Sequence, residues 1–296
     1  MTATKFICPN NDQVLISQCL ERCPHCVRCM AKPTLNAVAN SVKDRKLGKS
    51  FSVTELISGT REIFLKKTAD YAIKPNDQLF ALHGTAIHSV SEANSDSRVL
   101  TEFRLSDDLC SGQIDAYGDL LGNGKRILLD YKCTSSYKAM RALGLYKVDV
   151  PTGETYKTGA KKGQPKTRKE WRSDGVRHLL EWAIQVNYYR YLLEQHSFPV
   201  DEMYIQIYVR DYSVRMASER NIDRPIYLLK INKISDHWLR KYFKAKKNRL
   251  EEALKTGVVP DFCSTRENWN GRKCESYCDV YEQCKHIHEA KEEPAA

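Results

Sequence analysis

The sequence predicts an α/β fold in which a mixed central sheet is flanked by helices and the two ends of the chain form cysteine-rich lobes. Short β-type segments alternate with stretches in which apolar residues recur at helical spacing. The 296 residues are 42% hydrophobic, which is enough for one large domain with a real core. Nine of the eleven cysteines lie in the first 29 and the last 34 residues, so the ends and the centre differ in chemistry.

Four segments make up the chain: a cysteine-rich head (1–31), a polar connector (32–50), a core (51–255) and a cysteine-rich tail (260–288). No apolar run reaches bilayer length and no secretion signal follows Met1, so we expect a cytoplasmic protein without a membrane partner. The formal net charge of +10 indicates a polyanionic partner, because a basic surface releases counterions from phosphate backbones.

The first half of the core is predicted to be a short helix, a longer helix and an antiparallel meander. Ser52 and Glu55, in FSVTEL, are typical of a capping box, and helical spacing follows over 83–94. The meander consists of three strands joined by tight connections, the second of which is glycine-rich. Its strands are expected over residues 99–105, 113–119 and 126–132, with the glycine-rich turn at 120–126.

The second half of the core is predicted to contain two helices and two strands. The helices are expected over 175–195 and from Ser235 to just before Gly257, and the strands over 203–209 and 226–231. An insertion, 144–173, is polar, basic and punctuated by glycine and proline. We expect it to be a flexible basic loop or hairpin, which is either a solvated excursion or a contact for nucleic acid.

Two acids and a lysine are predicted to meet on neighbouring strands. In ILLDYKC, the two-residue period of a strand places Asp130 and Lys132 on one face. Asp115 lies in the preceding strand, where burial of a carboxylate is costly unless a cation compensates it. With the backbone carbonyl of Tyr131, the two carboxylates make an oxygen site of the kind that Mg²⁺ or Mn²⁺ prefers. Lys132 is expected beside an attacking water or a phosphate.

A lone Asp-x-Lys is usually a surface ion pair, but here the surrounding motifs resemble the RecB-like branch of the PD-(D/E)XK nucleases. The resemblance spans about residues 51–210. The RecB-like branch includes the CRISPR-associated exonucleases. Its motifs are FSVTEL, Gly84-x-x-x-His88, Asp115 in G-x-I-D, Asp130-x-Lys132 and Gln185-x-x-x-Tyr189.

The resemblance implies a restriction-endonuclease-like core that hydrolyses phosphodiester bonds in DNA with a divalent metal. It implies that His88, Asp115 and Asp130 bind the metal and that Lys132 assists the attacking water. The expected role is that of an exonuclease acting on DNA ends or single strands in recombination, repair or phage replication. A helicase or recombination protein is a possible partner, but the sequence does not indicate which one.

The resemblance also implies that Gln185 and Tyr189 line the site and touch the DNA strand. Their spacing of four residues independently places them on one helical face. Tyr189 has an equally good interpretation as a packed core residue, because tyrosines surround it. Glu102, on the first strand of the meander, either completes the metal shell, acts as a base, or is an ordinary exposed acid.

Both ends of the chain carry the same pattern, C-x10-C-x3-C-x5-C, which predicts two four-thiolate metal sites. The head ligands are Cys8, Cys19, Cys23 and Cys29, and the tail ligands are Cys263, Cys274, Cys278 and Cys284. Four thiolates suit either zinc or a [4Fe-4S] cluster. RecB-like relatives hold such a cluster with one cysteine before the core and three after it, and the last three tail cysteines resemble that trio.

Three cysteines fall outside the two quartets. Cys26 is a spare ligand, because its spacing to its neighbours is also cluster-like. Cys110 and Cys133 are predicted to be buried, inert thiols.

Two other functions remain open from the sequence alone. One is a non-catalytic nucleic-acid-binding protein that uses its cysteine lobes on a nuclease-like scaffold. The other is an RNA-directed or sequence-specific endonuclease built on the same core.

Overall fold

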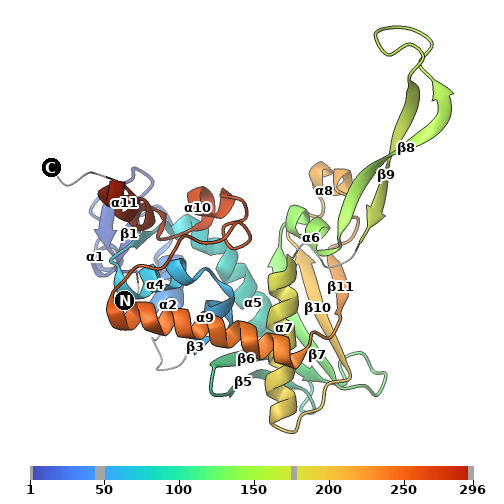
Figure 1. Cartoon of the computed structure of the whole chain (residues 1–296). Coiled ribbons are helices and arrows are strands. Elements are labelled where there is room, and N and C mark those ends of the chain that lie inside the picture. The colour runs from blue at the N-terminus through green and yellow to red at the C-terminus, as the bar shows by residue number, and fades with distance from the viewer. Residues whose placement is uncertain (1–2, 44–50, 175–178, 293–296) are drawn as a thin grey trace.

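The computed structural model describes residues 3–43, 51–174 and 179–292. Figure 1 shows helices gathered beside a central sheet, with one long hairpin projecting away from both. Among the helices described, none combines the length and the apolar character that crossing a bilayer requires.

The central sheet has six strands in the order β11-β10-β7-β6-β3, with β5 also paired to β6. The strands are β3 (Phe51–Ser52), β5 (Leu100–Ser106), β6 (Cys110–Gly118), β7 (Ile127–Thr134), β10 (Glu202–Val209) and β11 (Ile226–Ile231). β10 is parallel to β7 and β3 to β6, whereas the other three pairs are antiparallel. The sheet is therefore mixed, as the sequence predicts, and every strand predicted in the core is present.

The helices of the core follow the apolar spacing of the sequence. They are α3 (Val53–Ile57), α4 (Thr60–Thr68), the 3-10 helix η1 (Pro75–Gln78), α5 (Leu79–Ala93), α6 (Ser136–Ala142), α7 (Leu180–Gln195), α8 (Arg215–Glu219) and α9 (Asp236–Thr256). The capping box is confirmed: Glu55 N donates to Ser52 Oγ at 3.2 Å, and Ser52 N donates to the Glu55 carboxylate at 2.8 Å. Gly257, at φ 72°, ends α9 in the left-handed conformation that glycine adopts without strain. Residues 175–178 of the predicted 175–195 helix lie outside the described residues.

The head shares a small sheet with the core. β1 (Lys5–Ile7) pairs antiparallel with β2 (Gln13–Leu15) and parallel with β4 (Ala72–Ile73), and α1 (Ile16–Glu21) follows β2 directly. The first strand is thereby fixed to a segment 67 residues further along the chain, as the pairing of Lys5 with Ala72 shows.

The polar connector predicted over 32–50 is wrong for its first part, which forms helix α2 (Lys32–Lys43). Leu35, Val38 and Ala39 are each 0% exposed, and Val42 is 4% exposed. These positions recur every three or four residues, so one stripe of an otherwise polar helix is buried. Residues 44–50 lie outside the described residues.

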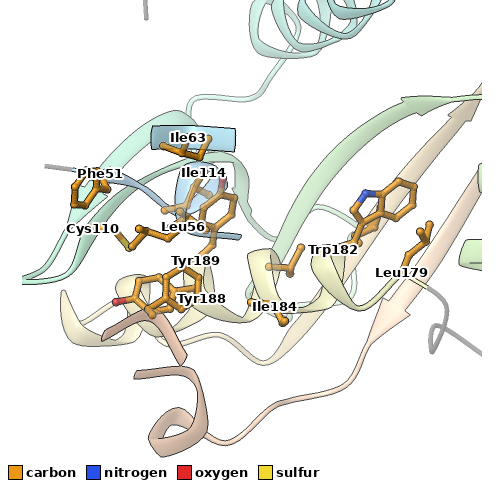
Figure 2. Close-up of a cluster of buried hydrophobic side chains, with 14 of the residues drawn as sticks. Phe51, Leu56, Ile63, Cys110, Ile114, Leu179, Trp182, Ile184, Tyr188 and Tyr189 are labelled. Atoms are coloured by element: carbon orange, nitrogen blue, oxygen red, sulfur yellow. The ribbon is translucent and has the colours of Figure 1, made fainter. Parts of the chain in front are cut away.

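Helix α7 supplies much of the core on its face of the sheet. Figure 2 shows Tyr188 and Tyr189 beside Leu56 of α3 and beside Cys110 and Ile114 of β6. Tyr188 also donates its hydroxyl hydrogen to Asp107 Oδ2 at 2.7 Å. The aromatic character of this helix therefore reflects packing at Tyr188.

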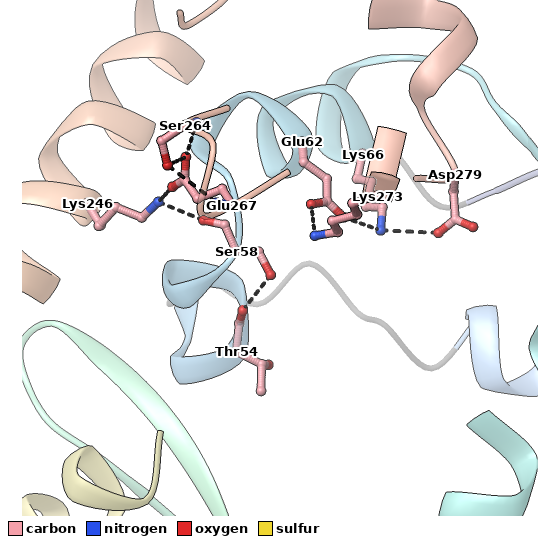
Figure 3. A network of polar contacts seen from close by, with 9 residues as sticks. All are labelled: Thr54, Ser58, Glu62, Lys66, Lys246, Ser264, Glu267, Lys273 and Asp279. Atoms are coloured by element: carbon pink, nitrogen blue, oxygen red, sulfur yellow. Dashed lines mark hydrogen bonds and ion pairs between the residues drawn. The ribbon is translucent and has the colours of Figure 1, made fainter. Parts of the chain in front are cut away.

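The tail is anchored to α4 and α9 by buried ion pairs (Figure 3). Its helices are α10 (Arg272–Tyr277) and α11 (Tyr281–Glu292). Glu62 of α4 accepts from Lys66 at 2.9 Å and from Lys273 at 2.5 Å. Lys246 of α9 pairs with Glu267 and donates to the carbonyl of Ser58 at 2.7 Å.

Candidate metal and active site

The sheet opens between β6 and its neighbours. Three residue pairs join β6 to β7, and the pair nearest the opening is Ala116 with Leu129. β3 pairs with β6 further along, at Cys110 and Ser111. Because β5 pairs with β6 along the other edge, the strands part on this edge around 112–115. A pocket of about 300 Å³ lies at this opening.

Three potential metal ligands meet in the wall of the pocket. Nδ1 of His88, on α5, lies 3.1 Å from Glu102 Oε1 on β5 and 3.6 Å from Asp115 Oδ1 on β6. In the described part of the chain, this is the one group of three such residues whose ligand atoms all lie within 4.8 Å of one another. The structure thus brings together two predicted ligands and the acid that the sequence offered as a third.

The carboxyl group of Asp115 has a pKa well above its ordinary value. Burial, together with the negative charge of Asp130, raises its pKa to about 7. The charges of Lys132 and His88 and the Tyr131 amide, which donates to Asp115 Oδ2 at 2.8 Å, act in the opposite direction but do not restore the ordinary value. More positive charge at this point would allow both acids to ionise.

Asp130 faces α7 and belongs to a second polar group. The residue is 1% exposed, and its Oδ2 lies 2.6 Å from Lys132 Nζ, a charge attraction outside hydrogen-bond geometry. Lys132 donates to Gln185 Oε1 at 3.1 Å. The amide nitrogen of Gln185 donates to Asp130 Oδ1 at 3.3 Å and to the Tyr189 hydroxyl at 2.9 Å. Four predicted site residues are therefore joined in one network.

Tyr131 lies on the opposite face of β7 from Asp130 and Lys132, as the strand period requires. Its ring meets the His88 ring edge to face at 5.7 Å. Helices α5 and α7 therefore contact opposite faces of β7, and the acidic residues lie between them. The Tyr131 carbonyl as a metal ligand stays a prediction.

Sequence reasoning missed Gln113 and Arg104. Gln113 donates to Glu102 Oε2 at 2.5 Å and accepts from Arg104 at 2.6 Å, and both residues line the pocket. Each lies two residues from a predicted site residue, Asp115 or Glu102, so the strand period was a signal that could have found them. Glu102 itself has φ 48°, a strained conformation for this residue that turns its carboxylate to His88.

Tyr189 both packs and lines the pocket. The residue is 4% exposed and belongs to the pocket wall. A Cβ built on Gly112 would lie 2.7 Å from the Tyr189 ring, so this position requires glycine for the ring to reach the opening. The two interpretations of Tyr189 offered by the sequence are therefore compatible.

The chemistry of these residues fits a divalent cation. Two carboxylates and one imidazole can together hold a divalent ion. Burial and the charge of Asp130 raise the pKa of Asp115, and a cation bound beside it would lower that pKa.

The head cysteines lie close together. Burial and the neighbouring Cys29 and Cys23 raise the pKa of the Cys8 thiol, and burial with Cys8, Cys23 and Cys29 raises that of Cys19. Among the described residues their sulfur atoms do not form a group within 4.8 Å of one another. Cys26, the spare cysteine, is exposed and has φ 68°.

The tail cysteines gather around the start of α4. Arg61 Nε donates to Cys284 Sγ at 3.0 Å. A Cβ built on Gly59 would lie 2.3 Å from Cys263 Sγ. Burial raises the pKa of the Cys274 thiol, and the nearby Cys284 raises it further. All eleven cysteines are free thiols.

The two cysteines of the centre differ in exposure. Cys110 is 0% exposed, and burial raises its pKa to about 12, as expected of an inert thiol. Cys133 is only half-buried, so the prediction of a buried thiol is wrong at that position.

No family model matches the chain, and no curated protein matches it. Among solved structures, the chain is similar to the crystal structure of SSO0001, with 17% sequence identity and a TM-score of 0.44. The match covers 86% of this chain and 94% of that one.

The raised pKa of Asp115 predicts a pH-dependent response to metal. The folded protein holds a proton on Asp115 between its ordinary pKa of 3.8 and about 7, so stability without metal falls as pH rises through that window. A divalent ion must displace this proton below pH 7 and need not above it. We expect Mn²⁺ to raise the melting temperature more at about pH 8 than at about pH 5.5. Two outcomes would contradict Asp115 as a metal ligand. One is an equal rise in melting temperature at both pH values, and the other is a rise in Asp115→Asn as large as in wild type.

Proposed function

We propose that the protein is a divalent-metal-dependent deoxyribonuclease that hydrolyses phosphodiester bonds, with exonuclease action on DNA ends or single strands. The observation that carries the proposal is the assembly of His88, Glu102 and Asp115 beside the Asp130–Lys132 pair at the opening of the sheet. Two acids, a lysine paired with one of them and an adjoining pocket suit the attack of water on a phosphate.

The proposed roles follow from the contacts. His88, Glu102, Asp115 and Asp130 would hold Mg²⁺ or Mn²⁺, which when bound polarises a phosphate and lowers the pKa of water. Lys132 orients the attacking water and stabilises negative charge on the phosphate.

The surrounding side chains position these groups. Gln185 holds the ammonium group of Lys132 at 3.1 Å. Arg104, in the pocket wall, offers a guanidinium group to the phosphate backbone.

The test is a cleavage assay on end-labelled linear DNA and on circular DNA. The proposal expects cleavage with Mg²⁺ or Mn²⁺, none with EDTA, and release of short products from the linear substrate only. If the protein binds DNA but cleaves it with neither metal, it is a non-catalytic binding protein and not a nuclease. Cleavage of circular duplexes would replace the exonuclease by an endonuclease.

Two adjacent tyrosines make a matched pair for the site. Tyr189→Phe removes the hydroxyl bound to Gln185, so cleavage is expected to slow by roughly 5- to 10-fold, the equivalent of a hydrogen bond of about 1 kcal/mol. Tyr188→Phe removes the bond to Asp107 in the core, so it is expected to lower the melting temperature and leave turnover unchanged. Rates and melting curves of both variants decide the matter. If Tyr189→Phe turns over at the wild-type rate, its role is packing alone.

We propose further that both cysteine quartets bind structural metal, either zinc or [4Fe-4S]. Cys23→Ser is expected to release one metal site per chain and to destabilise the head, because thiolate ligation is coupled to folding. Cys26→Ser is the control and is expected to keep full metal content, since Cys26 lies outside the quartet. In the tail, Cys274→Ser is expected to behave like Cys23→Ser. Elemental analysis and a visible spectrum of anaerobically purified protein measure the outcome; thiols that all titrate freely would exclude both sites.

A further inference from the structure

The insertion predicted over 144–173 is a projecting arm. β8 (Leu145–Thr155) and β9 (Pro165–Ser173) form an antiparallel hairpin that pairs with no other strand of the described chain. Figure 1 shows it extending away from the sheet and the helices. At about 3.3 Å per residue, the 11 residues of β8 reach roughly 35 Å, close to one turn of B-form DNA.

The arm is strongly basic and largely unpaired. Within 144–173 there are eight lysines and arginines against three acids. Lys166 pairs with Glu154 and Arg168 with Glu170. The other cations of the arm are exposed and form no ion pair with any residue that the structure describes. They are Lys147, Lys157, Lys161, Lys162, Lys169 and Arg172.

Two of the three aromatic rings of the arm lie beside lysines, and the third, Tyr146, is 42% exposed. Lys147 Nζ lies 4.7 Å from the centre of the Trp171 ring, and Lys161 Nζ lies 5.9 Å from that of Tyr156. Single-stranded nucleic acid is held largely by stacking bases on open aromatic faces. The arm presents these six exposed cations but a single exposed aromatic ring, which favours the phosphate backbones of a duplex over stacked bases.

The root of the arm leads to the candidate active site. β7 carries Lys132, and helix α6, which follows β7 directly, leads into β8. Lys138 of α6 lies 5.1 Å from the Trp182 ring and 5.4 Å from the Trp269 ring. Burial, and the neighbouring cations Lys132, Lys273 and Arg141, lower its pKa despite Glu181. Cations therefore crowd along the path from the arm to the pocket, and a polyanion would relieve their repulsion.

We propose that the β8–β9 arm binds the double-stranded part of the DNA substrate along its backbone, while one strand end enters the pocket at Asp115. The inference rests on the proposed nuclease function. A two-stranded ribbon of this length fits the major groove over about one helical turn. The arm thus makes a duplex with an end the preferred substrate class.

The test is a variant of the arm tip, Lys157→Gln/Lys161→Gln/Lys162→Gln, in the full-length protein. Its affinity for a blunt 30-base-pair duplex and for a single strand of equal length is measured in EDTA across a salt series. We expect the duplex Kd to rise roughly 10-fold and the slope of log K against log salt to fall by up to about 3, or about 0.9 per lost phosphate contact. Binding of the single strand and cleavage of a short single-stranded oligonucleotide are expected to stay near wild type.

The matched control is Lys241→Gln/Lys244→Gln/Lys255→Gln, which removes the same charge from the exposed side of α9. An equal loss of affinity in the control would overturn the inference, because net charge alone would then explain it. An equal or larger loss for the single strand would also overturn it. Binding is measured without metal and is therefore independent of cleavage. If wild type cleaves DNA but the arm-tip variant binds the duplex as tightly as wild type, only the role of the arm is refuted. An arm effect without cleavage by wild type in Mg²⁺ or Mn²⁺ refutes the proposed nuclease activity, leaving the arm as a duplex-binding element.

Discussion

Asp130→Asn is expected to lower the rate of DNA cleavage by roughly 10³-fold or more while changing the Kd for DNA by less than about twofold. The carboxylate of Asp130 is 1% exposed, so the substitution removes charge from the proposed reaction centre and not from the exposed surface. Asparagine has nearly the same shape and retains an oxygen for Gln185. Single-turnover cleavage and equilibrium binding measure the two quantities separately.

The substitution also reports on Asp115. Loss of the neighbouring negative charge removes one of the two causes that raise its pKa, so the pH dependence of the metal-induced melting shift should move to lower pH. Asp77→Asn, at an exposed position on η1, is the control and should leave rate, affinity and pH dependence unchanged. If Asp130→Asn cleaves at the wild-type rate, Asp130 has no part in catalysis.

The sequence predicted the core strands, and which candidate site residues share a face, because both depend on local periodicity. Asp130 and Lys132 share a face through the two-residue repeat of a strand, and Gln185 and Tyr189 through the four-residue repeat of a helix. The structure joins these four residues in one network. Each of these relations lies within a single strand or helix, so the spacing of residues along the sequence was enough to predict it.

Relations between elements were harder to predict. Gln113 and Arg104 belong to the pocket because β5 and β6 are paired in the register that places Arg104 opposite Gln113. The register of an antiparallel pair depends on packing that the sequence of one strand does not specify. Glu102, whose φ is positive, lies between Thr101 and Phe103, which pair with Ala116 and Ile114.

One segment was misjudged, and the form of another was left open, because their composition is polar. Helix α2 buries one narrow stripe, which the polar residues around Leu35 and Val38 conceal. The arm, by contrast, has no buried face, so its strands lack the alternation that marks a half-buried strand. Both a loop and a hairpin were therefore compatible with the sequence of 144–173.

Buried ion pairs between α4 and the tail lay beyond sequence reasoning, since Glu62 and Lys273 are 211 residues apart. Figure 3 shows Glu62 between Lys66 and Lys273, and Asp279 completes the group at 3.1 Å from Lys66. Glu62 is 6% exposed. Removal of the Glu62 charge leaves Lys273 without this partner and Lys66 with Asp279 alone.

Glu62→Gln is therefore expected to lower the free energy of unfolding by about 2–4 kcal/mol and the melting temperature by roughly 5–10 °C. Glu219→Gln is the control: its partner Arg215 is 92% exposed, so a change within about 0.5 kcal/mol is expected. Burial alone would raise the pKa of Glu62, but Lys66 and Lys273 outweigh it and hold the pKa below its usual value of 4.5. The stabilisation is thus present above pH 4.5 and is lost as pH falls through the lower pKa of the folded state. The difference between wild type and Glu62→Gln should accordingly be full at neutral pH and shrink in melting curves recorded below pH 4.5. A difference that is constant down to about pH 3, or absent at pH 7, would show that the tail is held to α4 by its apolar contacts and not by this group.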